Sequence, residues 1–294
     1  MENRLQHDGW EITVSPKKGA AILSCRYNGV DILRPYSGVP SEDFDAFNSG
    51  GFCLVPFSNR IAGGTFKHLG RHIKIGQTRP DFPNPIHGYG WLSAWELLPS
   101  DSGTLVLKYR FAPGDDGFDW PWAFEAVQSF AAAGGTLTHA LSVTNLSGRT
   151  MPAGLGFHPY FPNIDTAHLT ASAQSVWRAD KAGLPADLIA VPENWDFSTG
   201  RSVAGTQIDN CFKTGTPNAR ISYTDSDLAL KLTGSENLKF AVIYTGAGDG
   251  SFCYEPVTHM NNALNFQSSG SQTGMEDLAP GQSQYAAMQY IINA

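Results

Sequence analysis

Residues 122–131 read WAFEAVQSFA, residues 136–145 read TLTHALSVTN, and the pair Gly134-Gly135 lies between them. Each run alternates apolar and polar side chains. This is the pattern of a strand with one buried face, because successive side chains point to opposite sides of a sheet. The residues predicted on the buried faces are Phe124, Ala126, Phe130, Leu137, Leu141 and Val143. The two runs are therefore predicted to be strands separated by a glycine turn.

Short apolar runs followed by turns recur along the whole chain. Asn28-Gly29 and Leu69-Gly70 each separate two such runs, and Asn-Gly is a strong hairpin signal because both central residues of the turn need positive φ. Helical periodicity over 11 or more residues is hard to find. The remaining strands are predicted at 10–15, 21–27, 104–111, 168–173, 218–223, 227–233, 238–244, 251–254 and 284–292. The sequence predicts an all-β sandwich or barrel with a few short helices in its loops.

The chain has 294 residues, with neither a linker-like tract nor a repeat of fixed period. We therefore expect one domain over residues 1–294, although the length alone would suggest two. Long loops are expected at 34–50, 76–86, 112–121 and 178–212, and binding sites tend to be built on such loops.

Charge and cysteine usage restrict the class of partner. The formal net charge is −7, which argues against nucleic acid and gives no support to a membrane-surface role. None of the four cysteines lies in a C-x-x-C pair, and the N-terminus MENRLQHDGWEI has no apolar signal region. We expect four buried free thiols, no membrane span and a cytoplasmic protein.

Two stretches carry basic side chains among glycines and apolar residues. Arg60 lies in PFSNRIAGGTF (56–66) beside Asn59, and a buried guanidinium needs a partner. His87 lies in PIHGYGW (85–91), where glycines would let the backbone approach a ligand and aromatic faces would stack on a sugar. Taken alone, Arg60 is better explained by a structural role, and His87 by a structural or exposed position.

Two further stretches carry groups suited to proton transfer. His158, in GLGFHPYFP (154–162), precedes a proline that favours extended backbone, and its imidazole ordinarily titrates near neutral pH. Glu255 follows the apolar run Phe252-Cys253-Tyr254, where partial burial would raise its pKa toward that of a general base. The structural alternatives are a core histidine with a backbone partner, and a glutamate that is bonded to turn amides or paired with Arg60. Asp209 is a weaker candidate, predicted in a loop, and the aromatic residues of 118–122 suit a cleft or the core equally.

Several catalytic motifs are absent from the sequence: G-x-S-x-G, the P-loop and H-E-x-x-H. His87, His158 and Glu255 are nevertheless residue types that can form a metal triad.

Taken together and in this order, four stretches resemble the aldose 1-epimerase (galactose mutarotase) family. They are PFSNRIAGGTF, PIHGYGW, GFHPYFP and YEPVTHMNNALN, which lie between about residue 50 and residue 266. The resemblance implies a large twisted β-sandwich of the galactose mutarotase type, with no metal and no cofactor. It also implies a small-molecule aldose substrate and a monomer or homodimer.

The resemblance further implies a role for each matching residue. Glu255 would be the general base that takes the proton of the C1 hydroxyl, and His158 the general acid that protonates the ring oxygen. Arg60, His87 and Asn59 would bind the sugar, and Asp209 would correspond to a sugar-binding aspartate. The chain departs from galactose-active members at 116–122, where it reads DGFDWPW, so the particular sugar stays open.

Two rival functions follow from the same residues. A non-catalytic sugar-binding sandwich would not need both Glu255 and His158. A sugar-phosphate mutarotase would need a cationic clamp, and Arg34, Lys67 and Arg79 are interpreted as not clustered. A glycoside hydrolase or lyase on a related sandwich is the remaining enzymatic alternative.

Overall fold

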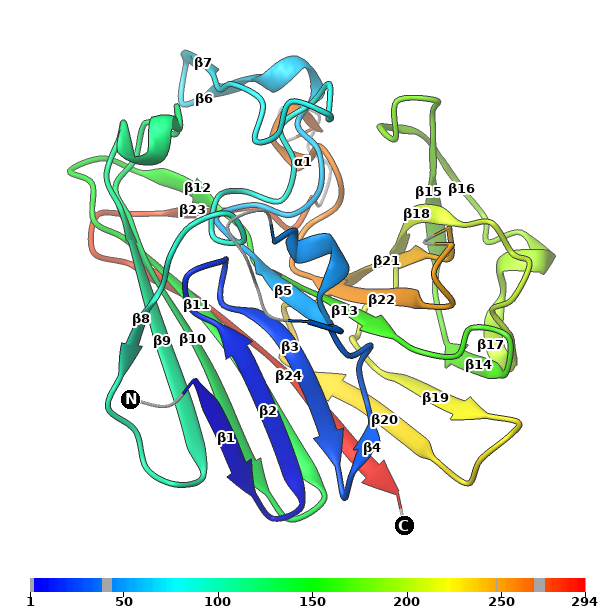
Figure 1. Ribbon diagram of the computed structural model, residues 1–294. Helices are drawn as coiled ribbons and strands as arrows, with labels where there is room; N and C mark the ends of the chain where they lie inside the picture. The colour runs from blue at the N-terminus through cyan, green and yellow to red at the C-terminus, as the bar shows by residue number, and fades with distance from the viewer. Residues whose placement is uncertain (1–2, 39–43, 247, 267–272, 294) are drawn as a thin grey trace.

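The computed structural model describes residues 3–38, 44–246, 248–266 and 273–293. Two large antiparallel sheets pack face to face in it, and this confirms the predicted all-β sandwich (Figure 1). Most of the apolar core lies between the two sheets. Among the described residues, no helix has the length and hydropathy to cross a membrane.

The first sheet runs through the front of Figure 1. Within the described residues its strands are β1 Arg4–His7, β2 Trp10–Ser15, β3 Ala21–Tyr27, β4 Val30–Asp31, β5 Gly51–Leu54, β13 Gly156–Phe161, β15 Ser175–Ala179, β16 Pro185–Ile189, β18 Asp209–Lys213, β21 Phe240–Tyr244 and β22 Phe252–Val257. They are ordered β1-β2-β3-β5-β13-β22-β21-β18-β15-β16, and β4 pairs with β3. β13 and β22 therefore lie side by side near the middle of this sheet.

The second sheet lies behind the first. In the described part of the chain its strands are β8 Glu96–Leu98, β9 Thr104–Phe111, β10 Phe124–Ala133, β11 Thr136–Asn145, β14 Ala167–Ala171, β17 Phe197–Ser202, β19 Ala219–Tyr223, β20 Ala229–Gly234 and β24 Ser283–Asn293. They are ordered β17-β14-β19-β20-β24-β11-β10-β9-β8.

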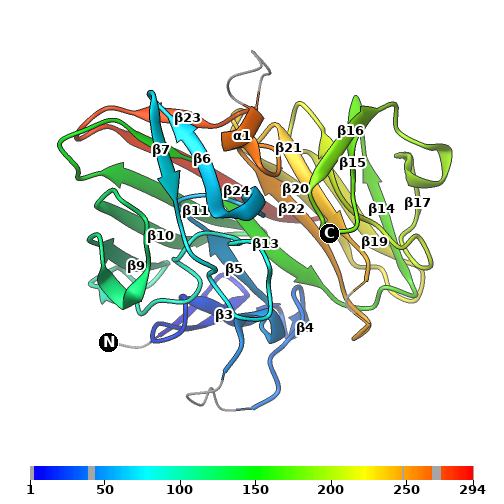
Figure 2. The ribbon, with the colours of Figure 1, turned by 90° about the horizontal axis from the view of Figure 1, so that it is seen from above.

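Small elements lie outside the two large sheets, some of them on the rim at the top of Figure 1. The paired strands outside the two sheets are β6 Thr65–His68 with β7 Arg71–Lys74, and β12 Met151–Ala153 with β23 Glu276–Leu278. The short helices are α1 Ala263–Phe266, η1 Ala46–Asn48, η2 Ala62–Gly64, η3 Asp115–Gly117 and η4 Glu193–Trp195. Figure 2 shows the β6–β7 hairpin and α1 next to each other on this rim.

The predicted alternation of the central strands is confirmed. Every second residue of β10 from Phe124 to Ala132 is buried, and Phe124 stacks on Phe111 of the neighbouring strand with ring centroids 5.2 Å apart. The predicted turn at Asn28-Gly29 joins β3 to β4 with positive φ at both residues.

Because Phe124 is fully buried, Phe124→Ala should lower the free energy of unfolding by about 3–5 kcal/mol. Chemical denaturation measures this value. Glu125→Ala, one residue along on the opposite face, is the matched control and should change stability by less than about 0.5 kcal/mol. Equal losses in both variants would contradict the assigned faces of β10.

The prediction of a long loop over 178–212 is wrong. Two complete strands, β16 and β17, form within it, and β18 begins there. β16 begins with Pro185 and β17 contains Gly200, which weakens the sequence signal for strands. Both strands form the outer edges of their sheets, where such residues are tolerated.

The other loop predictions are largely confirmed. Residues 76–86 contain no strand, and 112–121 contain only the short η3. Residues 39–43 of the loop predicted at 34–50 lie outside the described part of the chain. The single domain predicted over 1–294 also includes residues that the structure does not describe.

Candidate active site

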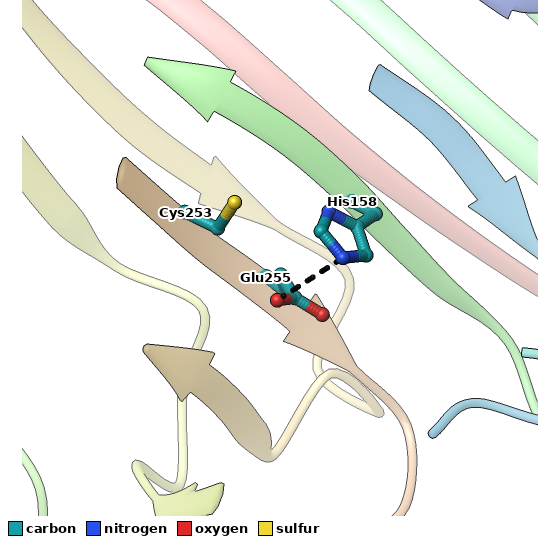
Figure 3. A group of neighbouring side chains, drawn as sticks. All are labelled: His158, Cys253 and Glu255. Atoms are coloured by element: carbon teal, nitrogen blue, oxygen red, sulfur yellow. Dashed lines mark ion pairs between the residues drawn. The ribbon is translucent and has the colours of Figure 1, made fainter. Parts of the chain in front are cut away.

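His158 and Glu255 lie opposite each other on adjacent strands. β13 and β22 pair with Gly156 opposite Val257 and Tyr160 opposite Cys253, and this register places His158 across from Glu255. The His158 Nε2 and Glu255 Oε1 atoms are 3.5 Å apart (Figure 3). Glu255 was expected at the end of a strand, but it lies inside β22, so its position is fixed by the sheet on both sides.

Strand alternation explains why these two polar groups share one face of the sheet. The flanking side chains Phe157 and Tyr254 point into the core between the sheets. His158 and Glu255 therefore point to the other face, away from the second sheet. There they line the floor of a pocket and do not belong to the core between the sheets, although they are only 5 % and 2 % exposed.

Burial dominates the electrostatics of the pair. Desolvation raises the pKa of Glu255 well above its usual value, and the nearby charge of Asp209 adds to this while Arg60 opposes it. Desolvation lowers the pKa of His158 to about 3. Both shifts disfavour the charged form, so burial favours the uncharged pair, a carboxylic acid beside a neutral imidazole.

A pocket of about 360 Å³ opens above this pair. All six residues singled out in the sequence line it: Asn59, Arg60, His87, His158, Asp209 and Glu255. The structure thus brings together five separate stretches of the chain, while the chemical role of each residue stays a prediction.

His87 is held by its backbone and by Asn59. Its φ is +61°, and Gly88 follows with φ +67° at a point where an added Cβ would lie 2.1 Å from the carbonyl oxygen of Val55. The Nδ1 atom of His87 accepts a hydrogen bond from the backbone N–H of Asn59 (3.2 Å), so in the neutral ring Nε2 carries the proton. Burial lowers the pKa of His87, followed by the effects of His158 and Arg60. The ring is therefore a neutral donor beside His158, with ring centroids 5.2 Å apart.

Arg60 and Asp209 face each other on the wall of the pocket. The Arg60 Nη2 and Asp209 Oδ2 atoms are 3.7 Å apart, and the Asn59 side-chain oxygen accepts from the Arg60 backbone N–H (2.9 Å). The prediction of Asp209 in a loop is wrong, because it is the first residue of β18 and pairs with Tyr244. Desolvation raises the pKa of Asp209 despite its 41 % side-chain exposure, and Arg60 opposes this shift. The predicted alternative of a direct Glu255–Arg60 pair is not found among the described ion pairs.

An aromatic clamp orients the His158 ring. Phe52 and Tyr160 stack on the imidazole, with ring centroids 4.6 Å and 4.9 Å away and interplanar angles of 28° and 25°. Arg34 lies over Tyr160, 3.9 Å from the ring centroid. The Nδ1 atom of His158 has no hydrogen-bond partner among the described residues. The ring lines the pocket and not the core between the sheets, so the alternative of a core histidine does not describe this side chain.

The sequence interpretation overlooked several residues of the pocket wall. Arg34 and Arg79 both line the pocket, so the interpretation that they are not clustered is wrong, although Lys67 lies elsewhere. Arg34 pairs with Asp249, and Arg79 pairs with Asp45 (2.7 Å) and with Asp81. The other lining residues that were overlooked are Phe47, Asn48, Phe82, Ile86, Tyr160, Val242 and Tyr244. Most of the overlooked wall comes from the loops predicted at 34–50 and 76–86, and their length was the only signal.

The segment 112–122 does not line the pocket. Trp120 and Trp122 are fully buried, with Trp120 packed at a tilt beside Phe57 and Trp122 stacked on Phe66. The aromatic residues of DGFDWPW therefore belong to the core, and the departure at this segment changes no side chain of the pocket wall.

One group of potential metal ligands combines the two residues of the pocket floor with the fully buried Cys253 beside them. Within the described residues, His158, Cys253 and Glu255 each offer a ligand atom, and these atoms lie within 4.8 Å of one another (Figure 3). His87 is not part of this group, so the triad considered from the sequence is replaced by one that contains a thiol.

Comparisons with known proteins place the whole chain among aldose 1-epimerase-like proteins. The family model described as aldose 1-epimerase matches residues 1–290. The uncharacterized protein YphB of Escherichia coli (strain K12) is 28 % identical over 294 residues, which cover 97 % of this chain and 96 % of YphB. The crystal structure of a putative aldose 1-epimerase from E. coli K12 is similar with a TM-score of 0.89 and 25 % identity, covering 100 % of this chain and 99 % of that one. A galactose mutarotase-like protein from Clostridium acetobutylicum has a TM-score of 0.86 at 24 % identity, covering 99 % and 94 % of the two chains.

Proposed function

This chain belongs to the aldose 1-epimerase family, and on that premise we propose that it interconverts the α and β anomers of a free aldose by acid–base opening and closure of the sugar ring. The observation that carries the proposal is the His158–Glu255 pair, 3.5 Å apart on the floor of a pocket. A protein that only binds sugar would not need two proton-transfer groups at this distance.

In the proposed reaction Glu255 takes the proton from the C1 hydroxyl while His158 delivers a proton to the ring oxygen. The bond between C1 and the ring oxygen breaks, and C1 becomes an aldehyde. Rotation about C1–C2 presents the other face of the carbonyl, and the same two proton transfers in reverse close the ring. Each turnover returns both residues to their starting protonation states.

Burial of the pair favours the ring-opening step. The reacting form is carboxylate with imidazolium, which contains the same single proton as the uncharged resting pair. Ring opening converts it to carboxylic acid with neutral imidazole, and so removes two charges from a site that solvates charge poorly. The two groups thus act as one unit whose total charge does not change.

The charges of the pocket wall favour a neutral sugar. Arg34, Arg60 and Arg79 each face a carboxylate, so none is left to hold a phosphate. His87, Arg60, Asn59 and Asp209 are proposed to bind hydroxyl groups and the ring oxygen. The sugar-phosphate alternative is therefore less well supported than the free aldose.

Polarimetry or NMR on freshly dissolved α-glucose and α-galactose tests the proposal. The protein should bring the anomers to equilibrium faster than the spontaneous reaction does. A panel of hexoses, pentoses and deoxysugars extends the test to the identity of the substrate. If no sugar of the panel equilibrates faster, the function is wrong and the sugar-binding alternative is favoured.

The aromatic clamp gives a further prediction. Tyr160→Leu should lower kcat by about 10–100-fold, because loss of the stacked ring lets the His158 imidazole turn away from the ring oxygen. Tyr160→Phe keeps the ring and should retain most of kcat. A loss of the same size in both variants would show that the hydroxyl, and not the stacking, matters.

The cytoplasmic location stays part of the proposal. All four cysteines are buried and unpaired, as predicted, which supports a reducing compartment. A monomer or homodimer is still expected.

A further inference from the structure

A fully buried thiol, that of Cys253, lies beside the two proton-transfer groups of the pocket floor. We propose that His158, Cys253 and Glu255 bind a thiophilic divalent cation of the Zn²⁺ type, which takes the place of the sugar and inhibits the enzyme reversibly. We call this group the thiol–imidazole–carboxylate site. Cation binding is independent of the function proposed above, whereas the inhibition rests on it.

The sheet itself brings the three side chains together. Cys253 and Glu255 are two residues apart on β22 and so point to the same face, and His158 is the cross-strand partner of Glu255. Figure 3 shows all three side chains on one side of these strands. Ligands placed on paired strands near the middle of a sheet are held more accurately than ligands on loops.

The distances suit a small tetrahedral cation. Bonds of about 2.0–2.3 Å from Zn²⁺ to nitrogen, oxygen and sulfur place neighbouring ligand atoms about 3.3–3.8 Å apart. His158 Nε2 and Glu255 Oε1 are already 3.5 Å apart, and all three ligand atoms lie within 4.8 Å. The ligand atoms need to close by about 1.5 Å at most, and the fourth position is left for water or a sugar hydroxyl.

The donor types select the class of cation. A thiolate and an imidazole with one carboxylate suit Zn²⁺ and Co²⁺, whereas Mg²⁺ and Ca²⁺ prefer sites made entirely of oxygen. The Cys253 thiol would bind as thiolate and release its proton to solvent. The nearby Arg60 guanidinium and the burial of the site oppose binding, so we expect a weaker site than a structural zinc centre.

Two atoms of this group also lack hydrogen-bond partners. Glu255 Oε2 has none within the described parts of the chain, and a buried carboxylate oxygen without a partner is costly. A cation would satisfy it. His158 Nδ1 has no partner there either, although a resident metal site normally fixes its histidine through that second nitrogen. This combination favours an exchangeable inhibitor over a resident cofactor.

Inhibition follows because the cation would take the atoms that the reaction uses. A cation bound to Glu255 and to His158 Nε2 leaves neither a base for the C1 hydroxyl nor an acid for the ring oxygen. It also occupies the space of the sugar, so the inhibition should be competitive with the aldose.

Titration of the metal-free protein with Zn²⁺ and with Co²⁺ tests the site directly. Calorimetry should show one cation bound per chain, with release of protons. Co²⁺ should produce the intense near-ultraviolet absorption of a thiolate-to-cobalt transition, and Zn²⁺ should abolish it by displacement. Mg²⁺ should do neither. The cobalt absorption requires no variant, so the proposal stays testable even if a substitution prevents folding.

Cys253→Ser should weaken Zn²⁺ binding by about 10–100-fold, abolish the cobalt absorption and raise the inhibition constant by the same factor as the dissociation constant. Cys211→Ser is the matched control. Cys211 is another buried thiol on the same face of this sheet, separated from Glu255 by Val242, and its replacement should leave the binding of Zn²⁺ unchanged.

Three outcomes would overturn the site. These are the absence of saturable Zn²⁺ binding up to the millimolar range, cobalt binding without the thiolate absorption, and equal affinity in wild type and Cys253→Ser. Failure of the proposed function looks different, because the cation would then bind as described while no sugar equilibrates faster. If instead the sugars equilibrate and no cation binds, only the metal site is wrong.

Discussion

Glu255→Gln is expected to lower kcat for anomer interconversion by about 10²–10⁴-fold, the usual contribution of a positioned general base. The substitution keeps the size and shape of the side chain at a site that is 2 % exposed, but it removes the atom that would accept the proton of the C1 hydroxyl. Sugar binding should survive, because Arg60, His87 and Asp209 are untouched.

Polarimetry measures the rate, with the spontaneous reaction subtracted, and NMR titration measures the affinity for the sugar. Glu125→Gln, on the outer face of β10, is the control for a loss of carboxylate far from the pocket and should be as active as wild type. If Glu255→Gln retains the rate of wild type, the general base is another group.

The fold could largely be predicted from the sequence because its central strands have strong local signals. The predicted runs 104–111 and 136–145 coincide with β9 and β11. Each alternates clearly and ends at a turn or loop. The edge strands β16 and β17 were overlooked because residues at an edge need only one neighbour and tolerate proline and glycine.

The members of the site could be predicted, but their arrangement could not. His158 and Glu255 are distant in sequence, and only the register of β13 with β22 makes them neighbours. Nothing local encodes that register. Cys253 was overlooked as a site residue for a similar reason. Its side chain shares a face of the sheet with Glu255 only because both residues lie in one strand, and the strand was predicted to end before Glu255.

The net charge of the pocket wall depends on ion pairs between residues that are distant in sequence, and these pairs form only in the folded protein. Arg34 reaches Asp249, and Arg79 reaches Asp45 from another loop. In the sequence these arginines look like separate surface charges. In the structure they line one pocket, and their partners neutralise them, so a cluster of arginines alone does not imply an anionic substrate.

His158→Asn is expected to reduce kcat as strongly as Glu255→Gln, by about 10²–10⁴-fold, because ring opening needs a proton delivered to the ring oxygen in the same step that removes one from C1. The aromatic clamp of Phe52 and Tyr160 should stay in place around the smaller side chain, so circular dichroism and thermal unfolding should report a folded protein.

The double variant separates a joint mechanism from two independent contributions. If the pair acts as one unit, Glu255→Gln combined with His158→Asn should be no more than a few-fold slower than the slower single variant, because the first substitution already prevents the coupled transfer. If the losses multiply, each residue contributes on its own, and the shared proton across the 3.5 Å gap between His158 and Glu255 does not govern the reaction. Rates of all three variants on the best sugar of the panel decide between these two results.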